Sequence, residues 1–552
     1  EGFRVNSDYD LDAASGKFVL ELDSDSRLIL TGDFYYEEHG EPGGLRRQEP
    51  GVPDPARSVL YEVDRNATSR FFDRFRLTRY FGSLEYQIMF SDTTRLDITA
   101  FGGYLSRWSK RQRGGDFGVM PVPNPAPGTT SSTNTVQDRK VWNEGVDARL
   151  RHDYQLGGET STLAGGVYFY HALQERTDKR GATPDANDGQ LRTLNTGETF
   201  NYSIFAENRF HFGRLSIVPG FRIEFIDQSL DEDVNVAKAT NPASQGGPFP
   251  LAHQSDFSVT PLFGLGISYL LVEGGQTSTS GTLPDPKDQD AKETTAAAVI
   301  TEAGPPRLEL YSNVSKGYRP RTYGELVPTS ATGIVNSNLE EGHSVEAEIG
   351  LRGRPLPYLK FDLSGFYIRF EDQISELTVP NPGTPPPATV VVTQNVGDAR
   401  YWGAEASVEL DLLAMLNGGA ESPYGRLSLF GNVTWLDAEF TSGPAVGKIP
   451  VFAPEYLFKT GVIYRWKDRV KLGLIGTMLD DHWADANNTF QRFIPAYQVW
   501  DLTAEVNFCD GRIGVFAGVG NLFNQDFWAE ARDEGIVPAY KRNYYGGLKI
   551  RF

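Results

Sequence analysis

Basic residues gather around one stretch of the sequence that could bind an anion. Five basic positions bracket one predicted loop: Arg107, Lys110, Arg111, Arg113, and Arg139 or Lys140. The planar guanidinium group of arginine matches the geometry of a carboxylate, so arginine side chains are the ligands expected wherever a protein binds such an anion. The alternative for each residue is a charge that is solvated at the surface of a loop.

The sequence contains no motif for covalent chemistry. It has no H-E-x-x-H metal motif, no G-x-S-x-G nucleophile elbow and no phosphate-binding P-loop. The glycines of "GLGISY" (264–269) lie in a predicted strand with no helix behind it, and "DANDG" (185–189) lacks a complete set of calcium ligands. The seven histidines show no metal-ligand pairing. We expect no enzymatic activity, no metal site and no cofactor.

The composition narrows the function classes further. The 552 residues carry a net charge of −19, which argues against a nucleic-acid partner, because such a partner requires a basic surface. A single cysteine, Cys509, excludes an internal disulfide and a cysteine-based zinc site. There is no run of 18 or more apolar residues, so the sequence predicts no transmembrane helix. A transmembrane strand needs only about 9 to 11 residues, with alternate ones apolar.

Short segments of alternating apolar and polar residues recur from end to end. In the last one, "KRNYYGGLKIRF", the residues Tyr544, Leu548, Ile550 and Phe552 share one face. Such alternation is typical of β-strands whose two faces meet different surroundings. A large soluble β-sandwich or a propeller would show the same alternation. A propeller also requires a repeat of about 40 to 50 residues, which we do not find.

The lengths of the connections indicate a barrel in a membrane. Tight turns such as "QLGGE" (155–159) and "CDGR" (509–512) alternate with long polar segments such as 38–68 and 527–539. This alternation is typical of an outer-membrane β-barrel. We predict an all-β fold, a transmembrane antiparallel β-barrel with long extracellular loops and short periplasmic turns. The polar, low-complexity segment 273–304 departs from the alternation and is expected to be an insertion, either disordered or containing a short hairpin.

About nineteen strands are predicted. Their cores are expected at 10–22, 27–37, 70–90, 94–108, 138–154, 160–176, 196–212, 214–229, 255–272, 306–318, 342–353, 358–373, 390–410, 425–438, 456–466, 469–480, 494–508, 511–524 and 541–552. A closed antiparallel barrel has an even number of strands, because its first and last strands must pair antiparallel. An open edge in lipid would leave unpaired backbone groups at several kcal/mol each. Either one of the predicted strands is wrong, or an odd number of further strands completes the barrel.

Several stretches, spread in order over nearly the whole chain, resemble one family. They are "YYEEHGEPGGL" (35–45), "DRFRLTRYFGSLEYQ" (73–87), "NSNLEEGHSVEAEIGLR" (336–352), "GDARYWGAEASVEL" (397–410), "IPVFAPEYLFKTGVIYRW" (449–466), "DDHWADANNTFQRFIPAYQVWDL" (480–502), "GVGNLFNQDFW" (518–528) and the terminal "YYGGLKIRF". The sequence resembles the TonB-dependent outer-membrane receptors, and within them the ferric citrate receptor group. The resemblance implies an integral protein of the Gram-negative outer membrane.

The resemblance also implies parts that residues 1–552 do not match. Family members have a 22-stranded barrel filled by an N-terminal plug, and the plug carries the TonB box. The sequence matches the barrel only. The plug and about three first strands are expected in a separate N-terminal chain or in another part of the same polypeptide. Three strands added to nineteen give the 22 of the family, in agreement with the odd deficit.

The function implied by the resemblance is the uptake of a ferric chelate, of citrate type, with iron present only as cargo. For such an anionic cargo the candidate ligands are Arg46, Arg47, Arg107, Arg111, Arg113, Arg319, Arg321, Asn487, Asn488 and Gln491. Lys179 and Arg180 are further basic candidates. Lipopolysaccharide is the alternative partner for such residues. The implied partners are TonB, through the plug, and the lipids and lipopolysaccharide of the outer membrane.

In this family, the final strand resembles the signal that is read by the barrel-assembly machinery. Tyr544, Leu548, Ile550 and Phe552 would carry that signal. Two other functions stay open. The cargo could be another siderophore, a carbohydrate or a cobalamin-like cofactor, and the acidic net charge weighs against a citrate-type anion. A barrel without its plug could instead be a structural component of an envelope complex or a passive pore.

Overall fold

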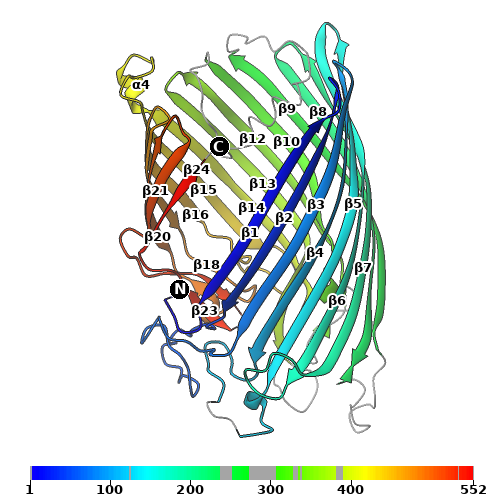
Figure 1. Cartoon of the computed structure of the whole chain (residues 1–552), viewed down its shortest axis with the longest axis vertical. Helices are drawn as coiled ribbons and strands as arrows, with labels where there is room; N and C mark the ends of the chain where they lie inside the picture. Colours follow the sequence, from blue (N-terminus) through cyan, green and yellow to red (C-terminus); the bar gives the residue numbers. More distant parts are fainter. Residues whose placement is uncertain are drawn as a thin grey trace.

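The computed structural model describes residues 3–122, 126–236, 251–272, 306–326, 334–335, 339–380, 389–532 and 534–550. Nineteen long strands form one antiparallel sheet that curves into the wall of a wide barrel (Figure 1). Each of them pairs with the next long strand along the chain, so the topology is an up-and-down meander. The predicted fold class is confirmed. The predicted insertion at 273–304 lies outside the described residues.

The long strands follow the alternating segments of the sequence closely. They are β1 (Tyr9–Glu21), β2 (Ser26–Gly40), β3 (Arg74–Ser91), β4 (Thr94–Gln112), β5 (Asn134–Leu156), β6 (Glu159–Gly181), β7 (Gln190–Phe212), β8 (Leu215–Asn235), β9 (His253–Val272), β10 (Arg307–Arg319), β12 (Gly342–Leu356), β13 (Leu359–Pro380), β14 (Thr389–Asp411), β15 (Arg426–Phe440), β16 (Tyr456–Trp466), β17 (Val470–Leu479), β20 (Tyr497–Phe508), β21 (Ile513–Gly520) and β24 (Asn543–Ile550).

The remaining elements are short and lie in the connections. They are the strands β11 (Ile334–Val335), β18 (His482–Trp483), β19 (Phe493–Ile494), β22 (Trp528–Arg532) and β23 (Gly535–Pro538), the helices α3 (Tyr323–Leu326) and α4 (Leu412–Leu416), and the 3-10 turns η1 (Thr130–Ser132) and η3 (Phe490–Arg492). Within the described ranges, no helix combines the length and the apolar character that a membrane crossing would require.

The two faces of the sheet differ in polarity, as the alternation requires. On β9, Phe257, Val259 and Phe263 all point to the outer face, with exposed fractions of 65%, 50% and 62%. Residues between them are less exposed and point into the barrel lumen. Large apolar side chains that stay exposed on a folded sheet fit a lipid surrounding.

A row of aromatic side chains crosses the outer face. Phe34, Tyr80, Tyr104 and Trp142 lie directly opposite one another on β2, β3, β4 and β5. The ring centroids of Phe34 and Tyr80 are 5.3 Å apart, and those of Tyr104 and Trp142 are 5.4 Å apart. Aromatic girdles of this kind mark the interface between the bilayer and water in transmembrane barrels. The row therefore fits an outer face of the wall that contacts lipid.

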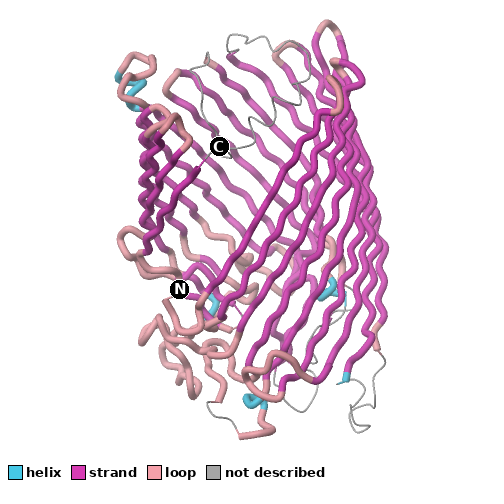
Figure 2. The backbone as a smooth tube through the Cα atoms, viewed as in Figure 1, coloured by secondary structure: helices cyan, strands magenta, loops and turns pink. Residues whose placement is uncertain are grey.

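The two ends of the barrel differ in the length of their connections (Figure 2). At the turn end, β5 and β6 are joined by Gly157 and Gly158 alone, whose φ angles of +62° and +89° suit a tight hairpin turn. At the loop end, lowest in Figure 2, long loops replace such turns. The predicted alternation of tight turns and long loops is thus present.

The strands β1 and β24 are the two edges of the sheet. Among the described residues, β1 pairs only with β2 and β24 pairs only with β21. Because the number of strands is odd, the two edge strands run in the same direction. The plug and three further strands implied by the resemblance stay a prediction.

At the loop end, loops from strands near the two edges of the sheet meet in what we call the loop joint. It consists of residues 41–73, 113–122 with 126–133, 480–496, and 521–532 with 534–542. Leu45 and Ile536 exchange two backbone hydrogen bonds of 2.8 Å, and the backbone N–H of Gly118 donates to the carbonyl of Glu534 at 2.8 Å. Leu45 and Ile536 are fully buried. The joint therefore has a small core of its own, which also includes Ile494 and Trp528.

Candidate anion-binding site

Three arginines lie side by side on the lumenal wall. Arg107 on β4 is directly opposite Arg139 on β5, and Arg139 is directly opposite Arg176 on β6. Trp142, three residues from Arg139, faces outward and is 41% exposed. Leu173, three residues from Arg176, also faces outward and is 36% exposed. Since successive side chains alternate across a strand, the arginines point into the lumen. We call Arg107, Arg139 and Arg176 the inner arginine row.

Elsewhere on this wall, arginines are neutralised within their own strand. A carboxylate two residues away pairs with each: Arg95 with Asp97 at 2.7 Å, Arg149 with Asp147 at 2.6 Å, Arg151 with Asp153 at 3.1 Å, and Arg222 with Glu224. Residues two apart on a strand share a face, so this spacing is that of a structural ion pair.

The inner arginine row is only partly neutralised. Arg176 pairs with Asp178 at 3.3 Å. Arg107 lies over the ring of Phe75, with its guanidinium carbon 5.2 Å from the ring centroid, and has no ion-pair partner in the part of the chain that the structure describes. The Nε atom of Arg139 is buried and lacks a hydrogen-bond partner there. Like charges directly opposite on neighbouring strands destabilise a sheet, so an anion bound between these arginines would relieve their repulsion.

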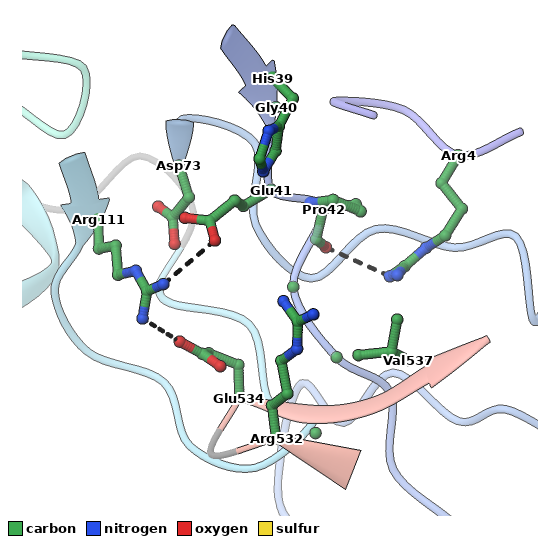
Figure 3. Close-up of a pocket in the computed structure, with 13 residues that line it drawn as sticks. Arg4, His39, Gly40, Glu41, Pro42, Asp73, Arg111, Arg532, Glu534 and Val537 are labelled. Carbon is green, nitrogen blue, oxygen red and sulfur yellow. Dashed lines mark hydrogen bonds and ion pairs between the residues drawn. The ribbon is translucent and has the colours of Figure 1, made fainter. Parts of the chain in front are cut away.

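Arg111, one of the predicted ligands, is occupied by the loop joint. Its Nη1 atom lies 2.6 Å from Oε1 of Glu534, and its Nη2 atom lies 3.1 Å from Oε1 of Glu41 (Figure 3). These carboxylates come from loops on opposite sides of the sheet edges. Arg111 thus bridges the two sides of the joint, in a cavity that Arg4, Asp73 and other polar side chains also line (Figure 3).

Asp73 also lines this cavity and is 3% exposed. Its carboxylate accepts the backbone N–H of Gln112 at 2.7 Å, and Arg70 lies 3.7 Å away. Burial raises the pKa of Asp73 to about 7, and the charge of Glu41 adds to the rise; Gln112, Arg70 and Arg111 oppose it.

The raised pKa of Asp73 makes the stability of the joint depend on pH. A group whose pKa is higher in the folded state stabilises the fold at low pH, and this contribution is lost as the pH rises through the folded pKa, here about 7. Thermal unfolding of the wild type in detergent is expected to shift to lower temperature between pH 5.5 and 8.5. Asp73→Asn, which cannot ionise, is expected to lack this component. If the unfolding temperatures of the two proteins shift equally with pH, the raised pKa of Asp73 is not the cause. Asp510→Asn, at an exposed position of the turn end, serves as the control and should keep the wild-type shift.

Arg46, Arg47 and Gln491 are also part of the loop joint. Arg46 lies 3.8 Å from Asp54. The side-chain amide of Gln491 donates to the carbonyl of Arg47 at 3.1 Å, and the N–H of Arg47 donates to Oε1 of Gln491 at 3.2 Å. The guanidinium of Arg47 stacks over the ring of Phe490 at 4.3 Å. These contacts give the three residues a structural role in the joint. Their role as cargo ligands stays a prediction.

The two predicted asparagines hold the neighbouring loop. The side chain of Asn488 accepts the N–H of Ile449 and donates to its carbonyl, each at 2.9 Å. The carbonyl of Asn487 accepts a hydrogen bond from Nζ of Lys448 at 2.7 Å. Asn488 has φ +52°, a conformation that asparagine tolerates better than most residues. Its position in the fold is thus explained without a cargo.

Arg319 and Arg321 are held by partners of their own. Arg319 forms a two-pronged ion pair with Glu325, with distances of 2.6 and 3.2 Å. Arg321 pairs with Asp256 and donates to the carbonyl of Leu339 at 3.1 Å. Of the predicted arginines, the structure thus places Arg107 on the lumenal wall, whereas the arginines at 46, 47, 111, 319 and 321 have partners elsewhere. Arg113 directly follows β4, and its backbone N–H donates to the carbonyl of Thr133 at 3.1 Å.

Sequence reasoning missed Arg176 as part of the site and left Arg139 as one of two choices. Arg176 lies inside a long strand rather than in a loop. The signal for it was the strand register, since 107, 139 and 176 become neighbours only once β4, β5 and β6 are aligned.

The predicted assembly signal lies on the β24 edge, where Tyr544, Leu548 and Ile550 are exposed. Phe552 lies outside the described residues.

The arrangement can bind an anion without changing it chemically. Within the described ranges, no group of three or more histidine, cysteine or carboxylate side chains is placed to hold a metal ion. The inner arginine row places three cations side by side on the wall, and Asp178 is the carboxylate that pairs with one of them. Such a set suits a solute with several carboxylate oxygens.

Solved structures share this fold. The ferric citrate transporter FecA in its unliganded form superposes with a TM-score of 0.73 at 18% identity, covering 99% of this chain and 71% of that one. The ferric-catecholate import receptor Fiu from E. coli K12 gives 0.71 at 15% identity, covering 100% and 76%. The ferric yersiniabactin uptake receptor FyuA from Yersinia pestis gives 0.66 at 14% identity, covering 98% and 70%. At these identities the likeness establishes the fold alone.

A family model described as "TonB dependent receptor-like, beta-barrel" matches residues 15–522. The match includes every strand of the inner arginine row and the loops of the joint up to β21. Members of this family are receptors and transporters rather than enzymes, and their barrel lies in the outer membrane. The chain belongs to the TonB-dependent receptor β-barrel family.

Proposed function

We propose that this protein is an outer-membrane receptor that takes up an anionic ferric chelate whose iron is held by carboxylates, as in ferric citrate. The inner arginine row is the observation that supports the proposal. It places three guanidinium groups in register on the lumenal wall with a single paired carboxylate among them. Transport would draw on TonB through a plug, as the family membership implies.

The charge pattern favours a carboxylate cargo over an uncharged one. A carbohydrate binds mainly through neutral hydrogen bonds and stacking, and it would not offset the repulsion among Arg107, Arg139 and Arg176. A chelate with several carboxylate oxygens can accept paired hydrogen bonds from each guanidinium, which roughly doubles the strength of each bond relative to a neutral pair. The net charge of −19 does not oppose this, because binding depends on the local charge of the lumenal wall.

The proposal is tested by comparing chelates with the purified protein in detergent. Tryptophan fluorescence reports binding of ferric citrate, of a neutral ferric hydroxamate and of a ferric catecholate. We expect ferric citrate to bind most tightly and the neutral chelate not to bind. Raising the salt from 0.01 to 1 M shortens the screening length from about 30 to about 3 Å. This change should weaken the binding of ferric citrate by roughly tenfold or more. Tight, salt-independent binding of the neutral chelate would contradict the proposal.

The second candidate cargo is a ferric catecholate, since the structural relatives include a receptor named for that class. A catecholate chelate is also anionic, and the row would attract it. If the ferric catecholate binds more tightly than ferric citrate, with the same salt dependence, the cargo would still be an anionic chelate, but a catecholate rather than citrate.

A further inference from the structure

The connection between β14 and β15, residues 412–425, differs from the other connections at the turn end of the barrel. The others that the structure describes contain two to four residues each, as in 157–158 and 509–512. The β14–β15 connection is much longer and begins with α4, whose sequence is Leu-Leu-Ala-Met-Leu. Figure 1 shows α4 at the upper left margin of the barrel, beyond the ends of the strands. Joining two neighbouring strands requires neither this length nor a helix.

Local contacts hold α4 with part of its apolar surface exposed. The carboxylate of Asp411 accepts the backbone N–H of Ala414 at 3.1 Å and so caps the start of the helix, and Gly418, with φ +66°, follows its end. Ala414 is buried, whereas Met415 and Leu416 are 39% and 79% exposed. A single exposed leucine needs no explanation, but a capped helix that ends in two exposed apolar residues presents a fixed apolar surface.

The connection is tied to the outer side of the barrel rim. On β16, Tyr464 shares the apolar outer face with Val462, whereas Arg465 falls on the lumenal face. The hydroxyl of Tyr464 donates to the carbonyl of Tyr424 at 2.8 Å. Because the donor faces outward, the connection lies against the lipid side of the rim rather than across the lumen.

Aromatic rings and a lysine lie beside this contact. Tyr424 is 74% exposed. Trp466 lies two residues beyond Tyr464 on the same face, and Nζ of Lys467 is 5.6 Å from the centroid of its ring. Tryptophan and tyrosine gather where the hydrocarbon of a bilayer meets water, and lysine there extends its charge towards the headgroups. Since the tight turns of an outer-membrane barrel face the periplasm, the adjoining lipid surface is the periplasmic leaflet.

We infer that α4 and Tyr424 form a membrane anchor that lies in the periplasmic leaflet, with glycerophospholipids as its partner. The apolar surface of α4 continues the lipid-facing wall, because α4 follows Leu410, which is directly opposite the outward-facing Leu429. The neighbouring lysine also favours lipid over a protein partner, since lysine is depleted in protein–protein interfaces and common at membrane interfaces. The anchor is independent of the cargo, so its test does not depend on the proposed function.

Spin labelling in vesicles of phosphatidylethanolamine and phosphatidylglycerol tests the anchor. Cys509 is replaced by serine, so that Leu416→Cys supplies the one cysteine for a nitroxide label. Oxygen concentrates in the hydrocarbon and a nickel chelate stays in water, so the ratio of their collision rates with the label reports its depth. We expect this ratio to be at least about threefold higher at 416 than at exposed positions outside the anchor. Heat-modifiable migration on gels verifies that each labelled protein has folded.

Two control labels are placed at exposed positions of the turn end. Glu421→Cys lies in the same connection as α4, and Asp92→Cys lies in the tight turn between β3 and β4. Both labels are expected to collide mainly with the nickel chelate. If the label at 416 gives the same ratio as both controls, α4 lies in water although only lipid is present, and the inference is overturned in favour of a protein partner.

A charge on α4 provides a second test with the label at position 415. In Met415→Cys/Leu416→Asp, the carboxylate is expected to draw α4 out of the leaflet into water and to lower the ratio at least about twofold relative to Met415→Cys alone. The barrel itself should be unaffected, because Leu416 is largely exposed and belongs to no core. The matched control is Val446→Asp, at a position that is 59% exposed in a loop of the loop end, and it should leave the ratio unchanged. An unchanged ratio in the Leu416→Asp protein would refute the anchor.

Discussion

Replacing Arg107 and Arg139 together by glutamine is expected to weaken the binding of ferric citrate at least about a hundredfold. Each guanidinium can form charge-assisted hydrogen bonds, and such bonds contribute about 1.5 to 3 kcal/mol each. The loss of two therefore corresponds to about 3 kcal/mol or more, and every 1.4 kcal/mol is a factor of ten. Stability should change little or rise, because the two charges repel each other in the empty protein and face no carboxylate partner of their own.

The matched control for this prediction is Arg149→Gln/Arg151→Gln. Both residues also belong to β5, and both are paired with carboxylates on their own strand, at 2.6 and 3.1 Å. The control removes the same net charge and is expected to change the affinity for ferric citrate less than about threefold, since long-range effects of paired charges are small. A control that binds as weakly as the Arg107/Arg139 variant would show that only the overall charge of the lumen matters.

Placing a charge in the core of the loop joint is expected to open it. Leu45 is fully buried and exchanges two backbone hydrogen bonds with Ile536 across the joint. Leu45→Asp would bury a carboxylate among apolar side chains, at a cost of several kcal/mol, which is enough to release a loop held by local contacts. We expect rapid proteolytic cleavage within residues 41–73, while the strands remain resistant because the sheet is untouched.

The control for the joint is Leu416→Asp. Leu416 ends α4 at the turn end and is 79% exposed, so the same substitution there buries no charge. The loops of the Leu416→Asp variant should be cleaved no faster than those of the wild type. If Leu45→Asp also leaves the loops resistant, the contacts of Leu45 and Ile536 do not hold the joint together. Arg111→Met should have a milder effect in the same direction, because it removes the ion pairs with Glu41 and Glu534 but adds no buried charge.

The fold was accessible from sequence because its signals are local. Alternation along Phe257, Val259 and Phe263 predicts both a strand and its outward face, and two glycines at 157 and 158 predict a tight turn. The number of strands follows from counting such segments. The short elements of the loops, such as β22 with β23, were not predicted, because they depend on contacts within the joint rather than on a periodic pattern.

The site was accessible only in part, because ion pairing and register are long-range properties. Arg107 and Arg111 are four residues apart and look equivalent in the sequence, yet Arg111 meets Glu534, which is 423 residues away. Arg321 is similarly paired with Asp256 from β9. Arg176 became a neighbour of Arg107 through the alignment of three strands. A basic residue in a loop therefore predicts a ligand only after its possible partners have been placed.

The most direct test of the central claim is the position of iron in a crystal of this protein soaked with ferric citrate. Anomalous scattering at the iron edge locates the metal without reference to the side chains. The inner arginine row predicts an iron peak on the lumenal wall beside Arg107, Arg139 and Arg176, with citrate oxygens between the metal and the guanidinium groups. An iron peak beside Arg319 and Arg321 instead, or no peak in crystals of a protein that binds ferric citrate in solution, would contradict it.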